Sequence, residues 1–216
     1  MNYTKKLNID INISRLREQY LEHFTVPPKL KNTKHEIIDY SNNPDEDKIV
    51  ISDKTVQKVG DYGYGIVVKH IPWEYELIRS KLDITIDTAR VFITNPYTKL
   101  PIHKDAVAGG KNKKLREWAI NIPLFGCERG ETVWYNDIPE YENCQMYSAE
   151  GALVSLSHPN PIEHYREGLD CIKLIKTDVF HGVDNSDNPN HRVILSLRSN
   201  DNLSWTEISE RIDESF

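Results

Sequence analysis

The chain has 216 residues, with 27 lysines and arginines against 33 aspartates and glutamates, which gives a formal net charge of −6. A chain of this length buries a sizeable core, so a small scaffold held together by disulfides or structural metals is excluded. Because 38% of the residues are hydrophobic and 28% are charged, wholesale disorder and a fibrous architecture are excluded too. The acidic balance also disfavours nonspecific nucleic-acid binding, which needs a basic surface.

Cysteine usage and the absence of long apolar runs bear on the compartment. The three cysteines, Cys127, Cys144 and Cys171, are odd in number and show no CxxC spacing, which argues against a disulfide framework and a zinc knuckle. Residues 1–10 have no apolar stretch of the kind that signal peptides contain, and no window approaches about 18 apolar residues. We therefore predict a cytoplasmic protein with no membrane partner.

The first part of the chain, residues 1–83, is expected to be a mostly helical scaffold. An amphipathic helix is predicted over residues 14–24 because the apolar residues share one face; they are Leu16, Tyr20, Leu21 and Phe24. The polar stretch 40–47 is predicted to be a connector. Pro72 then precedes a second predicted helix, residues 73–82.

From residue 84 to residue 200 the sequence changes to short β-rich runs bounded by Gly, Pro, Asn or Asp. Such runs with no helices between them predict an antiparallel sandwich or barrel. The spacing of Ser204 and Glu207 predicts a capping box for a C-terminal helix within residues 201–216. We expect one domain over residues 1–216. The predicted strands are residues 90–94, 118–124, 131–135, 152–157, 171–175, 178–180 and 192–198.

A possible metal site begins with the pair His103 and Asp105. The two residues are two positions apart, so on extended backbone both side chains point to one side and can hold one ion. A pair of this kind arises easily by chance, so a further ligand must join it. His181, which follows the run 178–180 and precedes Gly182, is the candidate for that third ligand.

An arginine near these residues suggests an anionic ligand. Alternation along residues 192–198 puts Arg192, Ile194, Ser196 and Arg198 on one face and the apolar Val193, Leu195 and Leu197 on the other. An arginine on the inner face of a β-core costs free energy unless an anion pairs with it. Its planar fork suits a carboxylate bound through both oxygens.

Together, His103-x-Asp105, His181 and Arg192 resemble the Fe(II)/2-oxoglutarate-dependent dioxygenases. Two histidines and one carboxylate form the facial triad of non-haem iron oxygenases. The phrases KLPIHKD, GETVWY and VFHGV are also similar to this family, and the resemblance covers residues 90–199. It implies a mainly β fold whose core is a double-stranded β-helix, the jelly roll that cupins share, with flanking α-helices.

The resemblance also implies cofactors and roles. His103, Asp105 and His181 would hold Fe(II), which 2-oxoglutarate chelates, and Arg192 would pair with the distal carboxylate of that co-substrate. Ser196 or Thr94 would donate a further hydrogen bond. O2 would convert 2-oxoglutarate into succinate and CO2 while a substrate C–H bond is hydroxylated. A carboxylate at position 105 disfavours halogenation, because related halogenases have a small residue there.

The branch of the family stays open. Prolyl-hydroxylase-type members usually have a lysine where Arg192 stands. The nucleic-acid demethylase branch has the pattern RxNxTxR, which this chain matches at Arg192 and Arg198 but not at Ile194 and Ser196. Aspartyl/asparaginyl β-hydroxylases generally lack the carboxylate ligand. The substrate is therefore open among a free amino acid, a protein side chain, a small metabolite and a modified nucleotide.

Several other residues have two readings. Arg198 is either a strand-end salt bridge or a second anion contact. Four residues near the proposed mouth, Trp118, Asn121, Trp134 and Tyr135, either line a substrate pocket or pack in the core. The loop 106–116 is either a lid that attracts an acidic substrate or a solvated loop. His158, His164 and His191 are interpreted as structural or solvated residues.

Two rival functions use the same fold. A non-catalytic cupin-like protein would bind a metal or a carboxylate ligand and form no succinate. A metal-dependent isomerase or hydrolase would keep the metal ligands but would have no use for an arginine directed at a dicarboxylate.

Overall fold

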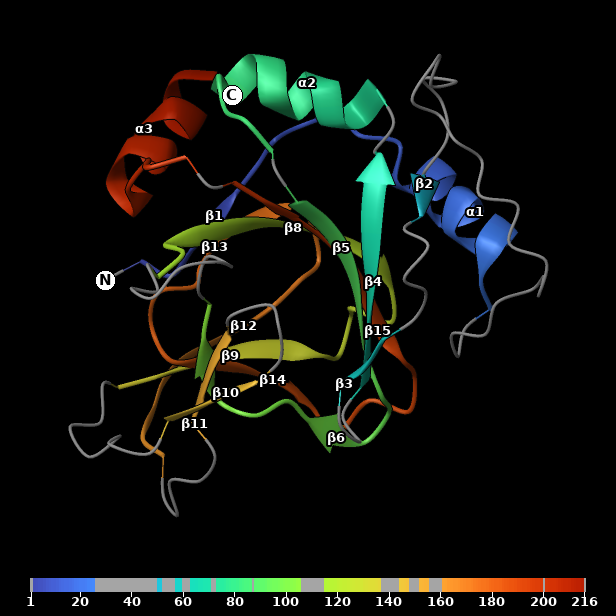
Figure 1. Cartoon of the computed structure of the whole chain (residues 1–216), viewed down its shortest axis with the longest axis vertical. Coiled ribbons are helices and arrows are strands. Elements are labelled where there is room, and N and C mark those ends of the chain that lie inside the picture. The colour runs from blue at the N-terminus through green and yellow to red at the C-terminus, as the bar shows by residue number, and fades with distance from the viewer. Residues whose placement is uncertain are drawn as a thin grey trace.

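The computed structural model describes residues 2–25, 50–51, 57–59, 63–70, 73–86, 88–105, 115–136, 144–147, 152–155, 161–199 and 201–215. Three helices lie on one side of the molecule: α1 (Ile13–His23), α2 (Trp73–Leu82) and α3 (Trp205–Ser215) (Figure 1). The predicted capping box of α3 is present, since the Glu207 carboxylate accepts hydrogen bonds from the backbone N–H and the hydroxyl of Ser204 at 2.7 Å each. No helix in the described ranges is long and apolar enough to cross a membrane.

The strands form two antiparallel sheets. The larger sheet has the order β1-β13-β8-β15-β5-β4-β2, with β3 added beside β4. Its strands are β1 (Thr4–Lys6), β2 (Val50–Ile51), β3 (Gln57–Val59), β4 (Gly63–His70), β5 (Thr88–Thr94), β8 (Trp118–Phe125), β13 (Lys173–Lys176) and β15 (Arg192–Arg198).

The smaller sheet has the order β10-β11-β7-β14-β9-β12, with β6 beside β14. Its strands are β6 (Thr98–Lys99), β7 (His103–Lys104), β9 (Glu131–Tyr135), β10 (Cys144–Tyr147), β11 (Ala152–Ser155), β12 (Glu163–Gly168) and β14 (His181–Asn185). It lies on the side of the larger sheet away from the helices (Figure 1).

Strand pairing identifies the core as a double-stranded β-helix. Strand β5 pairs with β15, β7 with β14, β8 with β13, and β9 with β12. In this nested series the first strand pairs with the last, and successive pairs alternate between the two sheets until the chain turns back. A chain folded back on itself in this way is a jelly roll, so the predicted fold class is confirmed.

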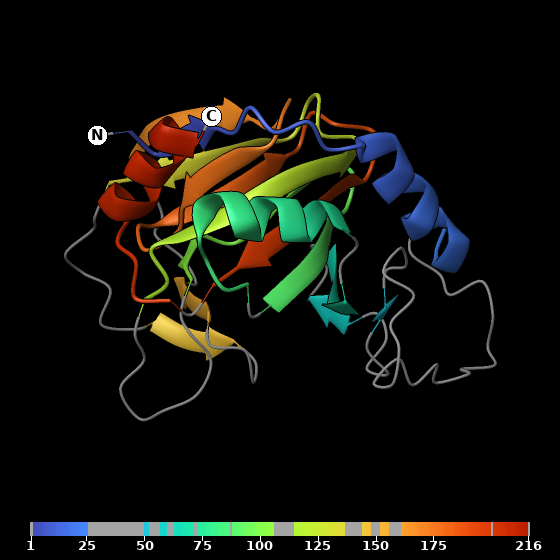
Figure 2. The same cartoon turned by 90° about the horizontal axis from the view of Figure 1, so that it is seen from above.

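The helices cover the outer face of the larger sheet. Figure 2 shows α2 lying across that sheet. Alternate residues of β15, namely Val193, Leu195 and Leu197, belong to one buried cluster with residues of α1 and α3 such as Leu16 and Ile208. Because side chains alternate along a strand, Arg192, Ile194, Ser196 and Arg198 face the interior between the sheets. The alternation predicted for residues 192–198 is present.

Two local predictions differ from the structure. The run 178–180 was expected to be a strand, but it forms bends and β14 begins only at His181. The segment 1–83 contributes strands as well as helices. The strand β4 pairs along β5, and β2 and β3 pair with the other side of β4 to form that edge of the larger sheet. This segment is therefore continuous with the β-core, because an edge strand offers unpaired backbone groups to any neighbouring segment.

Candidate metal centre

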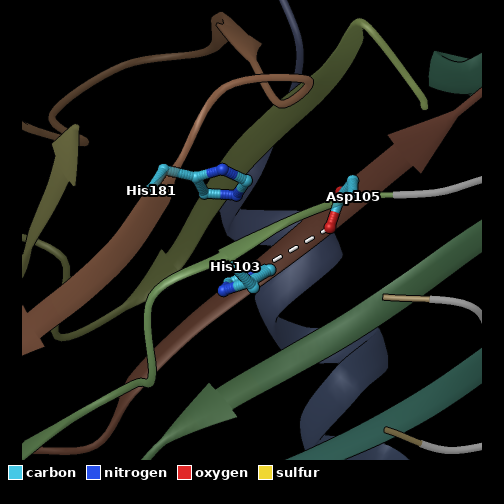
Figure 3. A group of neighbouring side chains, drawn as sticks. All are labelled: His103, Asp105 and His181. Atoms are coloured by element: carbon cyan, nitrogen blue, oxygen red, sulfur yellow. Dashed lines mark ion pairs between the residues drawn. The ribbon is translucent and has the colours of Figure 1, made fainter. Parts of the chain in front are cut away.

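The three predicted ligands come from neighbouring segments of the smaller sheet. His103 opens β7, Asp105 directly follows that strand, and His181 opens β14. The antiparallel pairing of β7 and β14 sets His181 directly opposite His103. One potential ligand atom from each of the three side chains lies within 4.8 Å of the others (Figure 3). Two imidazoles and one carboxylate are the donor set of the facial triad.

Both histidines are oriented by the backbone in the same way. The Nδ1 atom of His103 lies 2.8 Å from the carbonyl oxygen of Pro101, and that of His181 lies 2.9 Å from the carbonyl oxygen of Val179. A carbonyl only accepts, so each Nδ1 carries the proton and donates it. The lone pair is then on Nε2, and a histidine arranged in this way is ready to bind a metal.

Asp105 is held at its backbone and at both carboxylate oxygens. Its N–H donates to the carbonyl of Thr177 at 2.9 Å, and its carbonyl accepts from the N–H of Arg116 at 3.0 Å. Oδ1 lies 3.7 Å from Nε2 of His103, and Oδ2 lies 3.1 Å from the guanidinium of Arg198. One carboxylate oxygen therefore faces the histidines while the other is paired with an arginine.

The charges around the centre keep the ligands in the forms that bind metal. Burial raises the pKa of Asp105, but the positive charge of Arg198, followed by those of His181, His103 and Arg116, outweighs it and leaves the pKa at about 2. Burial, together with His103, lowers the pKa of His181 to about 4. At neutral pH Asp105 is a carboxylate and His181 is a neutral imidazole.

Arg192 lies on the inner face of β15, with 2% of its surface exposed. It stands opposite Thr94 on β5 and donates to the hydroxyl of Thr132 at 3.4 Å. Its Nε atom is buried and has no hydrogen-bond partner within the described ranges. Burial lowers the pKa of this guanidinium, so an anion beside it would relieve a desolvation cost.

The polar residues predicted to accompany Arg192 also face inward. Thr94 and Ser196 are each 2% exposed. Asn121 on β8 stands opposite Ser196, and its buried Oδ1 has no hydrogen-bond partner in the described part of the chain. Arg198 forms an ion pair with Asp105, which agrees with the prediction of a salt bridge for this arginine. The partner in that salt bridge is one of the candidate metal ligands.

The three aromatic residues proposed for a substrate pocket lie in different places. Trp118 belongs to the cluster beneath the helices, and its indole N–H donates to the carbonyl of Leu203 at 3.0 Å. Trp118 is therefore a core residue on the outer face, and the pocket reading is corrected for it. Trp134 stands directly opposite His181 but is fully buried and stacks on Tyr3.

The third aromatic residue, Tyr135, adjoins charged residues of the smaller sheet. Burial raises the pKa of its hydroxyl, and Glu163, Lys99 and Asp184 act on it as charges. Alternation along β9 puts Tyr135 on the face opposite to Trp134, so it points away from the metal ligands.

Other predicted features fall elsewhere. Residues 106–114 of the proposed lid and His158 lie outside the described residues. His164 is exposed on β12 and His191 is partly buried before β15, which agrees with a structural or solvated interpretation. Arg90, which was not predicted as a site residue, also faces inward, on β5 opposite Ser196. Its signal was the alternation of Arg90, Phe92 and Thr94, the pattern used for β15.

Comparisons with known proteins are limited to solved structures. No protein-family model matches the chain, and no curated protein matches it. Among solved structures, the chain is similar to Bacillus subtilis oxalate decarboxylase, a protein with Mn(II) centers, at a TM-score of 0.36 and 10% identity, over 70% of this chain and 29% of that one. The chain spans less than a third of the length of the oxalate decarboxylase chains it matches.

Two further likenesses are to a 2OG-Fe(II) oxygenase family protein and to an alpha ketoglutarate dependent carbocyclase. An oxidoreductase of the 2OG-Fe(II) oxygenase family from Burkholderia pseudomallei gives a TM-score of 0.39 and 12% identity, over 69% of this chain and 73% of that one. The non-heme alpha ketoglutarate dependent carbocyclase SnoK from nogalamycin biosynthesis gives 0.44 and 8%, over 90% and 78%. At these values the likenesses carry no argument about chemistry, and the fold assignment rests on the strand pairing described above.

Proposed function

We propose that the chain is an Fe(II)- and 2-oxoglutarate-dependent dioxygenase. In this reaction O2, 2-oxoglutarate and a substrate C–H group give succinate, CO2 and the hydroxylated substrate. The observation that carries the proposal is the meeting of two imidazoles and one carboxylate within 4.8 Å. The same interior holds a buried arginine, Arg192, whose Nε has no hydrogen-bond partner among the residues that the structure describes.

The residues present fit the metal that this reaction needs. His103, Asp105 and His181 would hold Fe(II) through two nitrogens and one oxygen, which leaves coordination positions for a co-substrate and for oxygen. When bound, the metal supplies the activation of O2. The protein's own part is to fix both imidazole rings through the carbonyls of Pro101 and Val179 and to keep the Asp105 carboxylate ionised.

Arg192 is proposed to bind the distal carboxylate of 2-oxoglutarate. Its guanidinium is buried beside the Thr132 hydroxyl, and Thr94 is its cross-strand neighbour. A bidentate carboxylate would satisfy its donors and offset its desolvation. Ser196, Asn121 and Arg198 lie further along the same inner face, so the co-substrate would run from Arg192 toward the metal.

The substrate of the proposed hydroxylation is a small molecule or a peptidyl residue. We propose hydroxylation and not halogenation, because Asp105 is a carboxylate at the position where related halogenases have a small residue.

The experiment is an anaerobic titration of metal-free protein with Fe(II) and 2-oxoglutarate, followed by visible absorption. We expect the weak metal-to-ligand charge-transfer band of the chelate, and succinate formation after O2 is admitted. Both signals should vanish in His103→Ala and Asp105→Ala. In Arg192→Ala, iron binding should remain while the affinity for 2-oxoglutarate falls.

Two results would decide against the proposal. A wild-type protein that binds Fe(II) but gives neither the band nor succinate would be a non-catalytic cupin-like binder. Unchanged 2-oxoglutarate affinity in Arg192→Ala would remove this arginine from the co-substrate site.

A further inference from the structure

The candidate metal ligand Asp105 is not held in place by the pairing of strands. Strand β7 ends at Lys104, so Asp105 lies beyond the short ladder that sets His103 opposite His181. Functional side chains must be kept within about 0.5 Å of their productive positions. The position of the Asp105 carboxylate therefore depends on the hydrogen bonds that other segments make with the Asp105 backbone.

Thr177 joins Asp105 and Arg116 in a closed ring of three hydrogen bonds. The Asp105 N–H donates to the Thr177 carbonyl at 2.9 Å, and the Arg116 N–H donates to the Asp105 carbonyl at 3.0 Å. The Thr177 hydroxyl completes the ring by donating to the Arg116 carbonyl at 2.7 Å. The first two bonds join backbone groups, and only the third depends on a side chain. The ring is therefore specified through the hydroxyl of Thr177.

The surroundings of Thr177 favour a rigid ring. The residue is 1% exposed, so water does not compete for its hydroxyl. Its N–H donates to the carbonyl of Glu117 at 2.9 Å, beside Arg116, so all three of its polar groups are directed at the segments that carry residues 105 and 116. A hydrogen bond in a buried site is stronger than in water, and losing one partner there is costly. Loss of the hydroxyl would thus be felt at Arg116 and, through it, at Asp105.

The connection that contains Thr177 also orients a second ligand. Residues 177–180 join β13 of the larger sheet to β14 of the smaller sheet. The carbonyl oxygen of Val179 lies 2.9 Å from Nδ1 of His181 and accepts its proton. Two carbonyls that are two residues apart therefore hold two of the three ligands, Asp105 at Thr177 and His181 at Val179.

Trp134 anchors the start of this connection. Its indole N–H donates to the carbonyl of Lys176 at 2.9 Å, and Lys176 directly precedes Thr177. Trp134 is itself fully buried and stands opposite His181 in the pairing of β9 with β14. Because the connection is fixed at this end, a broken ring at Thr177 would be relieved by movement of the Asp105 segment and not by movement of the connection.

We propose that Thr177 is a positioning residue of the metal centre, a role that rests on the proposed function only in requiring a metal at His103, Asp105 and His181. Its hydroxyl acts through the Arg116 carbonyl and the Asp105 backbone, and it holds the carboxylate where it can share one ion with the imidazoles. Groups that orient metal ligands from behind in this way commonly set the affinity of the site.

The test measures Co(II) binding to the full chain under anaerobic conditions and without 2-oxoglutarate. The visible absorption bands of Co(II) report the geometry of its ligands, and competition with a chromophoric chelator gives its dissociation constant. Thr177→Val removes the hydroxyl and keeps the branched shape. We expect its dissociation constant for Co(II) to rise about 10-fold or more, the usual scale for the loss of a group that supports a ligand, and the bands to shift. Thr177→Ser keeps the hydroxyl and should restore both.

Thr98→Val is the matched control. The Thr98 hydroxyl also donates to a backbone carbonyl, that of Asn95 at 2.8 Å, in the same smaller sheet but away from the three ligands. Whatever this variant loses in stability to urea, its Co(II) affinity and bands should match those of the wild type. Wild-type affinity and bands in Thr177→Val, or an equal loss of affinity in Thr98→Val, would overturn the proposal.

A second variant covers the case in which Thr177→Val does not fold. Trp134→Phe removes the indole donor to the Lys176 carbonyl and so loosens the start of the same connection. Its Co(II) bands should shift relative to the wild type, because the connection that holds Asp105 and His181 loses its anchor. Unshifted bands in a folded Trp134→Phe protein would count against a positioning role for this connection and for Thr177.

The positioning role and the proposed function fail in different ways. If Thr177→Val binds Co(II) as the wild type does, Thr177 has no positioning role, while the charge-transfer band and succinate formation of the wild type would still support the dioxygenase. If Co(II) binding depends on Thr177 but Fe(II) and 2-oxoglutarate give neither the band nor succinate, the proposed function fails and a metal centre positioned by Thr177 remains.

Discussion

Gly130 leaves the space that the Arg192 side chain occupies. A Cβ atom at position 130 would lie 2.4 Å from Cδ of Arg192 and 2.6 Å from Oδ1 of Asn185. Asn185 is itself fixed, because its amide donates to the carbonyls of Asn95 and Asn190 and its Oδ1 accepts from Asn188. The arginine is therefore the neighbour that would have to move.

Gly130→Ala is expected to raise the KM for 2-oxoglutarate about 10- to 100-fold, because a misplacement of about 1 Å at a positioning group has effects of this size. Binding of Fe(II) should be retained, since the metal ligands lie on other segments. The measurement is succinate formation against 2-oxoglutarate concentration. The control is Gly168→Ala, at which a Cβ would meet nothing within 4 Å; equal KM values in the two variants would contradict the assignment of Arg192.

Arg198→Gln is expected to destabilise the metal-free protein by about 3 kcal/mol, because it leaves the buried Asp105 carboxylate without its charged partner. Saturating Zn(II) should restore part of this loss, since the metal becomes a new partner for the carboxylate. The measurement is urea denaturation with and without chelator. Arg166→Gln, at a half-exposed ion pair with Glu131, should cost less than about 1 kcal/mol. If Zn(II) raises the free energy of unfolding of Arg198→Gln no more than that of the wild type, the result would count against the ion pair between Arg198 and Asp105.

The metal-free protein is expected to lose stability as the pH falls from 7 toward 4. His181 has a pKa of about 4 in the folded chain against about 6.5 when unfolded. Between these pH values the unfolded state binds a proton that the folded state does not. The free energy of unfolding therefore decreases as the pH decreases, by up to about 3 kcal/mol from this group. Denaturation of His181→Gln should show a flatter profile over this range, whereas His164→Gln, at an exposed position, should match the wild type.

Trp118→Phe tests the placement of Trp118 beneath the helices. It should lower stability by about 1 kcal/mol through loss of the hydrogen bond to the Leu203 carbonyl. The KM for 2-oxoglutarate and the charge-transfer band should stay unchanged, because the side chain faces away from the metal ligands. A shift of the band in this variant would mean that the indole reaches the interior.

Features that depend on local periodicity could be predicted from the sequence. The apolar stripe predicted over residues 14–24 corresponds to α1, and the Ser204 and Glu207 pair caps α3 as expected. The alternation along residues 192–198 predicted that Arg192 and Val193 lie on opposite faces of the strand. Local geometry alone fixes these relationships, because side chains repeat every 3.6 residues in a helix and every two in a strand.

Contacts between distant segments could not be predicted in the same way. The position of His181 opposite His103 depends on the pairing of β7 with β14, and the ion pair of Arg198 with Asp105 depends on how the two sheets face each other. Trp118 and Asn121 lie on opposite faces of the same strand, β8, and the helices cover only the face that carries Trp118. Which face of a strand is covered is set by packing between layers, and that packing leaves no local signal in the sequence.

The sequence by itself thus determined the residue types of the centre, the β-rich character of residues 84–200 and the division of strand residues into two alternating faces. Only the tertiary structure decided which of these side chains meet, that Arg198 pairs with a candidate metal ligand, and that Arg90 faces the same interior. The physical reason is that strand order and register bring together residues far apart along the chain, and backbone hydrogen bonds between strands do not depend on which side chains the strands carry.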